Sequence, residues 1–153
     1  MLKSRLALCL VCLFVLAPFA NARNPARAYQ PVTTPEEWDA DIAMRLGEHA
    51  YLGGDVPAAL AAFQSAASKD PRRAEAHWRA SHCLVVLDRI PEALLALERA
   101  RARAPRDPRI LNTLAVVQMK SGNVRSATES ARRAVRQAPR VADVWDTLGW
   151  AYL

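Results

Sequence analysis

The residues best suited to metal or acid–base chemistry in this sequence are His49, His77, His82 and Cys83. His77 and His82 are five residues apart on one predicted helix, so they do not share a face as an i, i+4 pair would. Cys83 directly follows His82 and therefore points in a different direction. No glycine-rich phosphate loop, nucleophile elbow or HExxH motif is present. We therefore expect no catalytic residue, cofactor or metal, with Cys83 partly buried and the histidines on a polar helix surface. The alternative is a metal-binding or enzymatic protein that uses His77, His82 and Cys83, and it requires the purified protein to retain zinc.

The first 22 residues have the pattern of a secretory signal peptide. Residues 1–5 carry two cations, residues 6–17 form an uncharged apolar run, and Ala20-Asn21-Ala22 has the small-x-small form of a cleavage site. The apolar run is shorter than the roughly 20 residues that span a bilayer. These features predict cleavage after Ala22 and a periplasmic or secreted protein. The alternative is an uncleaved leader that anchors the protein in a membrane.

Composition and charge narrow the possible fold classes and the possible partners. Apolar residues make up 52% of the chain and aromatic residues only 7%, and the abundant alanine, leucine and arginine favour packed helices. Removal of the leader would lower the net charge from +6 to +4, because Lys3 and Arg5 are lost, and would leave Cys83 as the only cysteine. No intramolecular disulfide is then expected. The mild positive charge favours anionic envelope surfaces or acidic proteins, and no nucleic acid partner is expected because aromatic and basic residues are not interleaved.

A period of 34 residues runs through the chain after the leader. Many independent series that share one period indicate stacked repeats. The series are Pro71, Pro105 and Pro139; Ala59, Ala93 and Ala127; Ala66, Ala100 and Ala134; Gly47, Ser81, Ala115 and Gly149; and Leu46, Ala80, Leu114 and Leu148. We predict a helical domain over residues 34–153, preceded by a flexible segment over 23–33. The predicted units of this domain are 40–73, 74–107, 108–141 and a partial unit at 142–153.

Each unit is predicted to form two antiparallel helices. In the first unit, Thr34-Pro35-Glu36-Glu37 has the form of a capping box and starts the first helix. The pair Gly53-Gly54 ends that helix, because glycine adopts a left-handed conformation at little cost. Asp55 then caps a second helix that closes before Asp70-Pro71, and Asn123 caps the corresponding helix of the third unit.

Small residues at fixed places are predicted to bring the paired helices close together. Gly47 and its equivalents would face Ala59 and its equivalents, since small side chains let two helix axes approach. Larger residues would fill the spaces between layers: Leu46, Phe63, Leu97 and Leu114. In the partial unit, Val144, Leu148 and Ala151 would have no following helix to cover them, and so short a helix must dock on the preceding pair.

This pattern resembles the tetratricopeptide repeat. The match rests on the 34-residue period, the terminal proline of each unit and the typical helix residues, which are Leu46-Gly47 and Leu148-Gly149, Ala59 and Phe63, and Trp145 and Tyr152. The resemblance implies an all-α fold, a right-handed superhelical solenoid of antiparallel helix pairs. It also implies a non-catalytic scaffold for protein–protein interaction.

By the same resemblance, the first helix of each unit lines a concave groove. The predicted groove residues are Met44, Glu48, Tyr51, Leu52, Trp78, Arg79, His82, Val85, Val86, Arg109, Asn112, Val116, Met119, Lys120, Asp146 and Trp150. An apolar stripe with charges of both signs suits an extended or helical segment that carries several apolar anchors. Trp78 and Trp150 are expected to dominate the binding energy. The alternative for each residue is simple packing or a solvated face.

Two charged features bear on the choice of partner. Some members of the family hold a C-terminal carboxylate with a Lys/Asn clamp, but Met44, Glu48, Arg79 and Thr113 stand where the resemblance requires Lys, Asn, Asn and Arg, and only Arg109 is a fair match. Binding of a chaperone tail is therefore not expected. A run of arginines spans a helix end and a turn, and it is interpreted as a solvated helix C-terminus or, alternatively, as a docking patch for an acidic partner. Its members are Arg99, Arg101, Arg103, Arg106 and Arg109.

The sequence as a whole predicts a scaffold or adaptor of the cell envelope that binds a protein or peptide. A place in pilus, secretion or envelope-assembly systems is an analogy at the level of the fold. Contact with a membrane is expected only if the leader is uncleaved. The alternatives are a structural module that forms homo-oligomers through residues 142–153, and a truncated fragment of a larger repeat protein.

Overall fold

The computed structural model describes residues 39–153, so the predicted leader, the segment 23–33 and the Thr34 capping box lie outside the described residues. Over this range the chain forms seven α-helices and no strand. The helices are α1 (Ala40–Leu52), α2 (Val56–Lys69), α3 (Ala74–Val86), α4 (Ile90–Arg103), α5 (Pro108–Lys120), α6 (Val124–Gln137) and α7 (Ala142–Trp150). None of these helices is long and apolar enough to cross a lipid bilayer.

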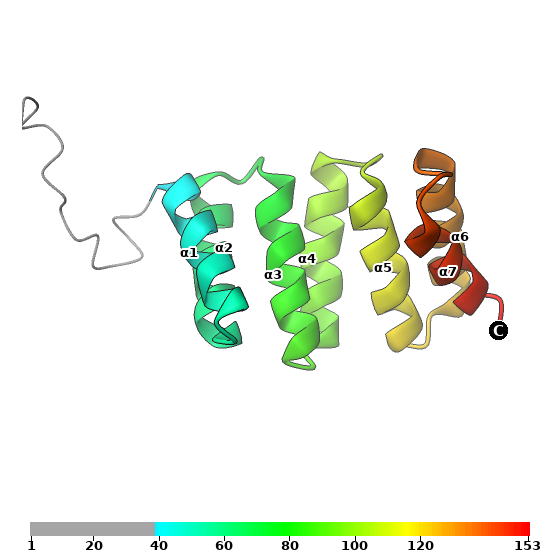
Figure 1. Ribbon diagram of the computed structural model, residues 1–153, viewed down its shortest axis with the longest axis horizontal. Helices are drawn as coiled ribbons and strands as arrows, with labels where there is room; N and C mark the ends of the chain where they lie inside the picture. The colour runs from blue at the N-terminus through cyan, green and yellow to red at the C-terminus, as the bar shows by residue number, and fades with distance from the viewer. Residues whose placement is uncertain (1–38) are drawn as a thin grey trace, which may run out of the picture. The chain divides into compact units, whose positions relative to one another are not determined.

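The helices are arranged as stacked antiparallel pairs. Each of α1, α3 and α5 packs most extensively on the helix that follows it, and each pair then packs on the next helix along the chain. Figure 1 shows α1, α3 and α5 in one layer and α2, α4 and α6 in the layer behind them. The predicted all-α stack of helix pairs is confirmed.

Short polar residues start the helices much as the sequence predicts. The carboxylate of Asp55 accepts a hydrogen bond from the amide of Ala58 at 3.0 Å, and the side chain of Asn123 accepts one from Ser126 at 3.2 Å. The start of α1 was predicted wrongly. The helix begins at Ala40 rather than after Thr34, because Asp39 is extended and its side chain caps α1.

The turns between paired helices use a left-handed residue at the same place in each unit. Gly54, Asp88 and Gly122 have φ of 82°, 57° and 79°, respectively. Glycine adopts this conformation without steric cost, and aspartate tolerates it better than most residues. The 34-residue spacing of these three positions gives each pair of helices the same connection.

Small residues on the first helices allow the predicted close packing, but the atoms nearest to Gly47 belong to Phe63 rather than to the predicted Ala59. A Cβ atom on Gly47 would lie only 2.6 Å from Cε1 of Phe63, so the Phe63 ring occupies the space left by the missing side chain. Phe63, Leu97 and Leu114 are buried as predicted. Leu46 is 40% exposed, and its predicted burial was wrong. Residues at its repeat position are covered by the second helix of the preceding unit, and no described helix precedes α1.

The partial unit docks on the preceding helix pair, as predicted. Val144 and Ala151 of the last segment are only 3% and 5% exposed, because they pack on the preceding helix pair. Val144 belongs to a small buried cluster with Leu111, Ala134 and Val135. No described helix follows to cover Val144 and Ala151, but the preceding pair covers them, so the exposed side of α7 is a different one.

Candidate functional site

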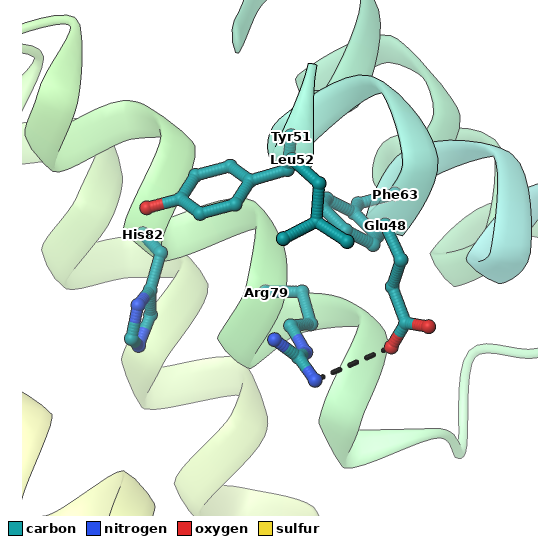
Figure 2. A pocket seen from close by; sticks show the side chains of 6 residues that line it. All are labelled: Glu48, Tyr51, Leu52, Phe63, Arg79 and His82. Atoms are coloured by element: carbon teal, nitrogen blue, oxygen red, sulfur yellow. Dashed lines mark ion pairs between the residues drawn. The ribbon is translucent and has the colours of Figure 1, made fainter. Parts of the chain in front are cut away.

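Two adjoining hollows lie along the layer formed by α1, α3 and α5. The first has a volume of about 230 Å³ and is lined by Glu48, Tyr51, Leu52, Phe63, Arg79 and His82. The second has a volume of about 280 Å³ and is lined by Tyr51, His82, Val85, Val86, Asn112, Thr113, Val116 and Val117. The two hollows share Tyr51 and His82, and we call them together the first-helix groove. In Figure 2, Tyr51 and Leu52 project from α1 over Arg79 and His82 of α3.

The structure brings together part of the predicted groove set. Nine predicted residues line the first-helix groove: Glu48, Tyr51, Leu52, Arg79, His82, Val85, Val86, Asn112 and Val116. Met44 does not, because it is 4% exposed and its side chain packs in the main hydrophobic cluster. The prediction that Met44 lines the groove was wrong. The remaining predicted residues line neither hollow: Trp78, Arg109, Met119, Lys120, Asp146 and Trp150.

Trp78 supports the groove from beside it. Its indole Nε1 donates a hydrogen bond to Oγ1 of Thr113 at 3.0 Å, which ties α3 to α5. The guanidinium carbons of Arg79 and Arg109 lie 5.2 Å and 5.0 Å from the ring centroid, and the His82 ring meets it edge-on at 4.7 Å. Trp78 is therefore engaged within the protein, so its main contribution is to hold the groove in shape.

Thr113 was not predicted as a groove residue, although it bonds Trp78 and lines the second hollow. The sequence spacing of Thr113 from Trp78 could have indicated its place. Thr113 follows Trp78 by 35 residues, one more than the repeat period, which places the two side chains on neighbouring first helices. Phe63 was predicted only as a core residue, but it also lines the first hollow.

An ion pair crosses the groove from α1 to α3. A guanidinium nitrogen of Arg79 lies 3.2 Å from a carboxylate oxygen of Glu48, as the dashed line in Figure 2 marks. Both side chains are over a third exposed, so this pair stabilises the fold only slightly. Further along the layer, the hydrogen bond from Arg109 lowers the pKa of the Asp107 carboxyl, and the two groups are 2.8 Å apart.

Three buried polar atoms of groove residues have no hydrogen-bond partner among residues 39–153. They are Nε2 of His82, Oδ1 of Asn112 and Nε of Arg79, which lies 4.0 Å from a carboxylate oxygen of Glu75 in an ion pair. A buried polar atom without a partner costs about 1–3 kcal/mol, so a ligand group that bonds to it would recover part of that cost. Burial, and then the charge of Arg79, lowers the pKa of His82, so its imidazole is neutral at neutral pH. The groove thus combines apolar hollows with unused hydrogen-bonding capacity.

The residues first considered for metal chemistry do not form a site. Within residues 39–153, no three His, Cys, Asp or Glu side chains lie close enough together to hold a metal ion. Cys83 is fully buried, and burial raises the pKa of its thiol to about 11, so the reactive thiolate is scarce at neutral pH. His77 is only 9% exposed and His82 lines the groove, so the prediction that these histidines lie on a polar surface was wrong.

The predicted arginine cluster is divided among local contacts. Arg101 pairs with Glu98 at 2.6 Å, and Arg109 pairs with Asp107. The side chain of Arg103 donates hydrogen bonds to the backbone carbonyl groups of Arg99 and Pro71. Most members of the cluster therefore stabilise helix ends and turns.

Acidification from about pH 7.5 to pH 5.5 should destabilise the protein through His77 and His82. Burial lowers the pKa of both imidazoles, and the charges of Arg103 and Arg99 lower that of His77 further. The unfolded chain, whose histidines titrate near about 6.5, then binds more protons than the folded chain, so the free energy of unfolding falls as the pH drops below that value. Above it, both states are neutral and the pH has little effect.

Urea unfolding followed by circular dichroism tests this prediction. A His77→Gln, His82→Gln variant should show a flatter dependence over the same pH range. The low pKa of Asp107 also favours the folded state, but that contribution is lost only near and below its ordinary value of about 4. An unchanged slope in the double variant would show that other groups control the response.

Comparison with known proteins agrees with the repeat architecture. A family model described as the tetratricopeptide repeat (TPR) matches residues 50–116 and 89–151, and a second model of the same description matches residues 24–74. The chain therefore belongs to the tetratricopeptide repeat family. A comparison with curated proteins found no match.

Several solved TPR structures are similar to the chain. The first TPR of Spaghetti (RPAP3), bound to the HSP90 peptide SRMEEVD, has a TM-score of 0.72 and 12% identity, with 74% of this chain and 90% of that chain covered. MamA has a TM-score of 0.70 and 21% identity, with coverage of 74% and 66%. The TPR2B domain of yeast Sti1, in a complex with pHsp70, has the same TM-score and identity, with coverage of 74% and 95%. At these identities the similarity establishes the fold alone.

Proposed function

We propose that the protein is a non-catalytic interaction scaffold whose first-helix groove binds a segment of another protein. The observation that carries this proposal is the combination of two apolar hollows with the buried atoms of His82 and Asn112 that have no hydrogen-bond partner. A polypeptide backbone offers a donor and an acceptor at each residue, and apolar side chains suit the hollows. The first TPR of Spaghetti and the TPR2B domain of Sti1, which share this fold, are found with an HSP90 peptide and with pHsp70.

The groove chemistry favours a segment with at least two apolar anchors. One anchor would enter the hollow beside Tyr51, Leu52 and Phe63, and the next would enter the hollow lined by valines of α3 and α5. Arg79 is already paired with Glu48, so a ligand carboxylate must compete for it. We therefore expect apolar contacts to contribute more to affinity than charge.

We further propose that the scaffold acts outside the cytoplasm, in the cell envelope or as a secreted protein. The support is the leader pattern of residues 1–22. N-terminal sequencing of the protein recovered from cell fractions tests this. A mature start at Arg23 in the envelope fraction is expected, whereas recovery in the cytosol with residues 1–22 intact would contradict export.

Substituting a charged residue into the groove should abolish capture of the partner. Val86 lines the second hollow and is 59% exposed, so Val86→Asp should place a carboxylate against the ligand without disturbing the core. We expect a loss of at least about tenfold in affinity, because a buried unpaired charge opposes binding. The measurement is a pull-down from envelope extract, followed by titration of the captured protein.

Leu95→Asp is the matched control. Leu95 is equally exposed at 61% but lies on α4, in the opposite layer. Both variants should keep the parental circular dichroism spectrum. Retention of the partner by Val86→Asp and its loss from Leu95→Asp would move the binding site to the other layer and refute the groove.

A further inference from the structure

Another hollow lies between α2 and α4, in the layer that Figure 1 shows behind α3. It has a volume of about 390 Å³, and we call it the α2–α4 hollow. His77, Ala80 and Leu84 of α3 form its floor, and the exposed side chains of Leu95 and Arg99 stand at its edge on α4. It shares no lining residue with the first-helix groove, so a ligand here would bind independently of the groove.

The repeat provides an internal comparison for this hollow. One unit later, a hollow of about 320 Å³ is lined by residues at the equivalent positions, 34 residues along the chain. There the floor carries Leu114 in place of Ala80, and Ser130 donates a hydrogen bond to Oε1 of Gln118 at 2.8 Å. The α2–α4 hollow has apolar residues at the places of Ser130 and Gln118, so it lacks this bond. It also has room above Ala80 that a leucine side chain fills in the next unit.

A buried imidazole at the floor of the α2–α4 hollow has an unused nitrogen. His77 is only 9% exposed, and its Nε2 has no hydrogen-bond partner among residues 39–153. The hydrogen bond from the imidazole to the backbone carbonyl of Pro71 is therefore donated by Nδ1. Burial, and then the charges of Arg103 and Arg99, lower the pKa of His77, so the imidazole is neutral at neutral pH and Nε2 is an acceptor. A neutral hydrogen-bond donor suits this position, because the two arginines repel a cationic one.

The edge of the hollow favours an aromatic ring. Arg99 makes none of the ion pairs found among residues 39–153, and a guanidinium group binds well to the face of an aromatic ring. The chain contains such an arrangement elsewhere. The guanidinium carbon of Arg132 lies 5.5 Å from the ring centroid of Tyr152, and Nε of Arg132 donates a hydrogen bond to the Tyr152 hydroxyl at 2.8 Å. A ring that carries a hydroxyl group therefore matches both the edge and the floor of the α2–α4 hollow.

We infer that the α2–α4 hollow binds a tyrosine side chain of another protein. The ring would lie over Ala80 with Arg99 against its face, and the phenol hydroxyl would donate a hydrogen bond to Nε2 of His77. Nε2 is covered in the free protein, and the exposed Arg99 side chain can move to admit the hydroxyl. A carboxylate suits the floor less well, because it requires a donor at Nε2, and His77 would have to take up a proton beside two arginines.

The tyrosines of a second copy of the chain are poorer occupants. Tyr51 lines the first-helix groove, and the hydroxyl of Tyr152 is already bonded to Arg132. Either residue would have to give up an existing contact to enter the hollow of a neighbour. The remaining tyrosine, Tyr29, lies outside the described residues, and the experiment tests it directly.

Three N-acetylated amino-acid amides test the inference with the full chain. They are N-acetyl-tyrosinamide, N-acetyl-phenylalaninamide, which lacks only the hydroxyl, and N-acetyl-para-carboxyphenylalaninamide, which carries a carboxylate in its place. The readout is the nitrogen chemical shift of His77 Nε2 at neutral pH, which responds to a hydrogen bond at that atom. The tyrosine amide should give a saturable shift with a dissociation constant of about 1 mM. The phenylalanine amide should bind roughly threefold to tenfold more weakly, because the hydrogen bond is lost.

Variants of the protein locate the site. Ala80→Leu should weaken binding of the tyrosine amide at least about fivefold, because the added side chain fills the space of the ring, and a leucine is accommodated at the equivalent Leu114. Leu95→Asp should also weaken it, because an aspartate four residues before Arg99 pairs with that arginine, yet it should keep the partner of the first-helix groove. Val86→Asp should bind the tyrosine amide normally. The two proposals can therefore fail independently.

Four results would overturn the inference. Two of them are equal binding of the tyrosine and phenylalanine amides, and no saturable shift with the parent protein. Tighter binding of the carboxylate compound would overturn it in favour of an acidic ligand. A His77 signal that changes with protein concentration or in Tyr29→Phe, with no probe present, would overturn it in favour of a second copy or of the chain's own tyrosine.

Discussion

Replacing Phe63 with alanine should lower the free energy of unfolding by about 4 kcal/mol, because a buried aromatic side chain is lost and a cavity remains. Phe63 is 1% exposed, and its ring fills the space beside Gly47. A domain of this size is stabilised by only about 5–15 kcal/mol, so the change is large. In a repeat protein each unit contacts its neighbours only, and the loss should be concentrated in α1 and α2.

Hydrogen exchange measured segment by segment is the appropriate experiment. Amides of residues 40–69 should lose protection in the Phe63→Ala variant, whereas those of α5 and α6 should keep most of theirs. Leu95→Ala is the control, because Leu95 is 61% exposed and its truncation should change stability by less than about 0.5 kcal/mol. Equal loss of protection throughout the chain would show that the repeats unfold as one cooperative unit.

The same substitution at two equivalent glycines should have opposite effects. Gly47→Ala should destabilise the protein by about 2 kcal/mol, because the new Cβ atom would lie 2.6–2.9 Å from three atoms of the Phe63 ring. Gly149→Ala should be neutral or stabilise the protein by up to about 1 kcal/mol, because alanine favours the helix and nothing obstructs the methyl group. Chemical denaturation of both variants measures the difference.

A second substitution, at Phe63, tests whether the Phe63 ring causes the expected loss of stability in Gly47→Ala. Phe63→Leu reproduces the residue found at Leu97, where the facing residue is Ser81 rather than glycine. In the Gly47→Ala background, Phe63→Leu should recover part of the lost stability, and a double-mutant cycle would give a favourable coupling between the two positions. Additive effects would show that the ring and the new methyl group avoid each other by a backbone shift.

The elements of the fold could be predicted from sequence because their signals are local. The cap of α2 depends on Asp55 and the next three residues, and the turn after α1 depends on Gly54. Because these cap and turn residues recur with a period of 34 residues, the same helix starts and turns are expected in each unit. The error at the start of α1 is of the same local kind, since two capping patterns lie within six residues and Asp39 is the one that caps the helix.

The exposure of individual residues was harder to predict because it depends on neighbouring units. Met44 precedes Glu48 by one helical turn, yet Met44 packs in the core and Glu48 lines the groove. Trp78 was expected to contact a ligand, but Thr113 and two arginines already surround it. The contacts with Thr113 and Arg109 join residues more than 30 positions apart, and they follow from the way that one unit packs against the next.

The stack of helix pairs could be predicted from the sequence alone, because the period, caps and small residues act through the local backbone and through contacts within one pair. It also defined which helix faces carry polar groups and which carry apolar ones. Only the tertiary structure decided which of those faces meet another helix, since that depends on the neighbour supplied by the next unit. The first-helix groove exists because α1, α3 and α5 lie side by side, and Gly149 is exposed because no described helix covers it.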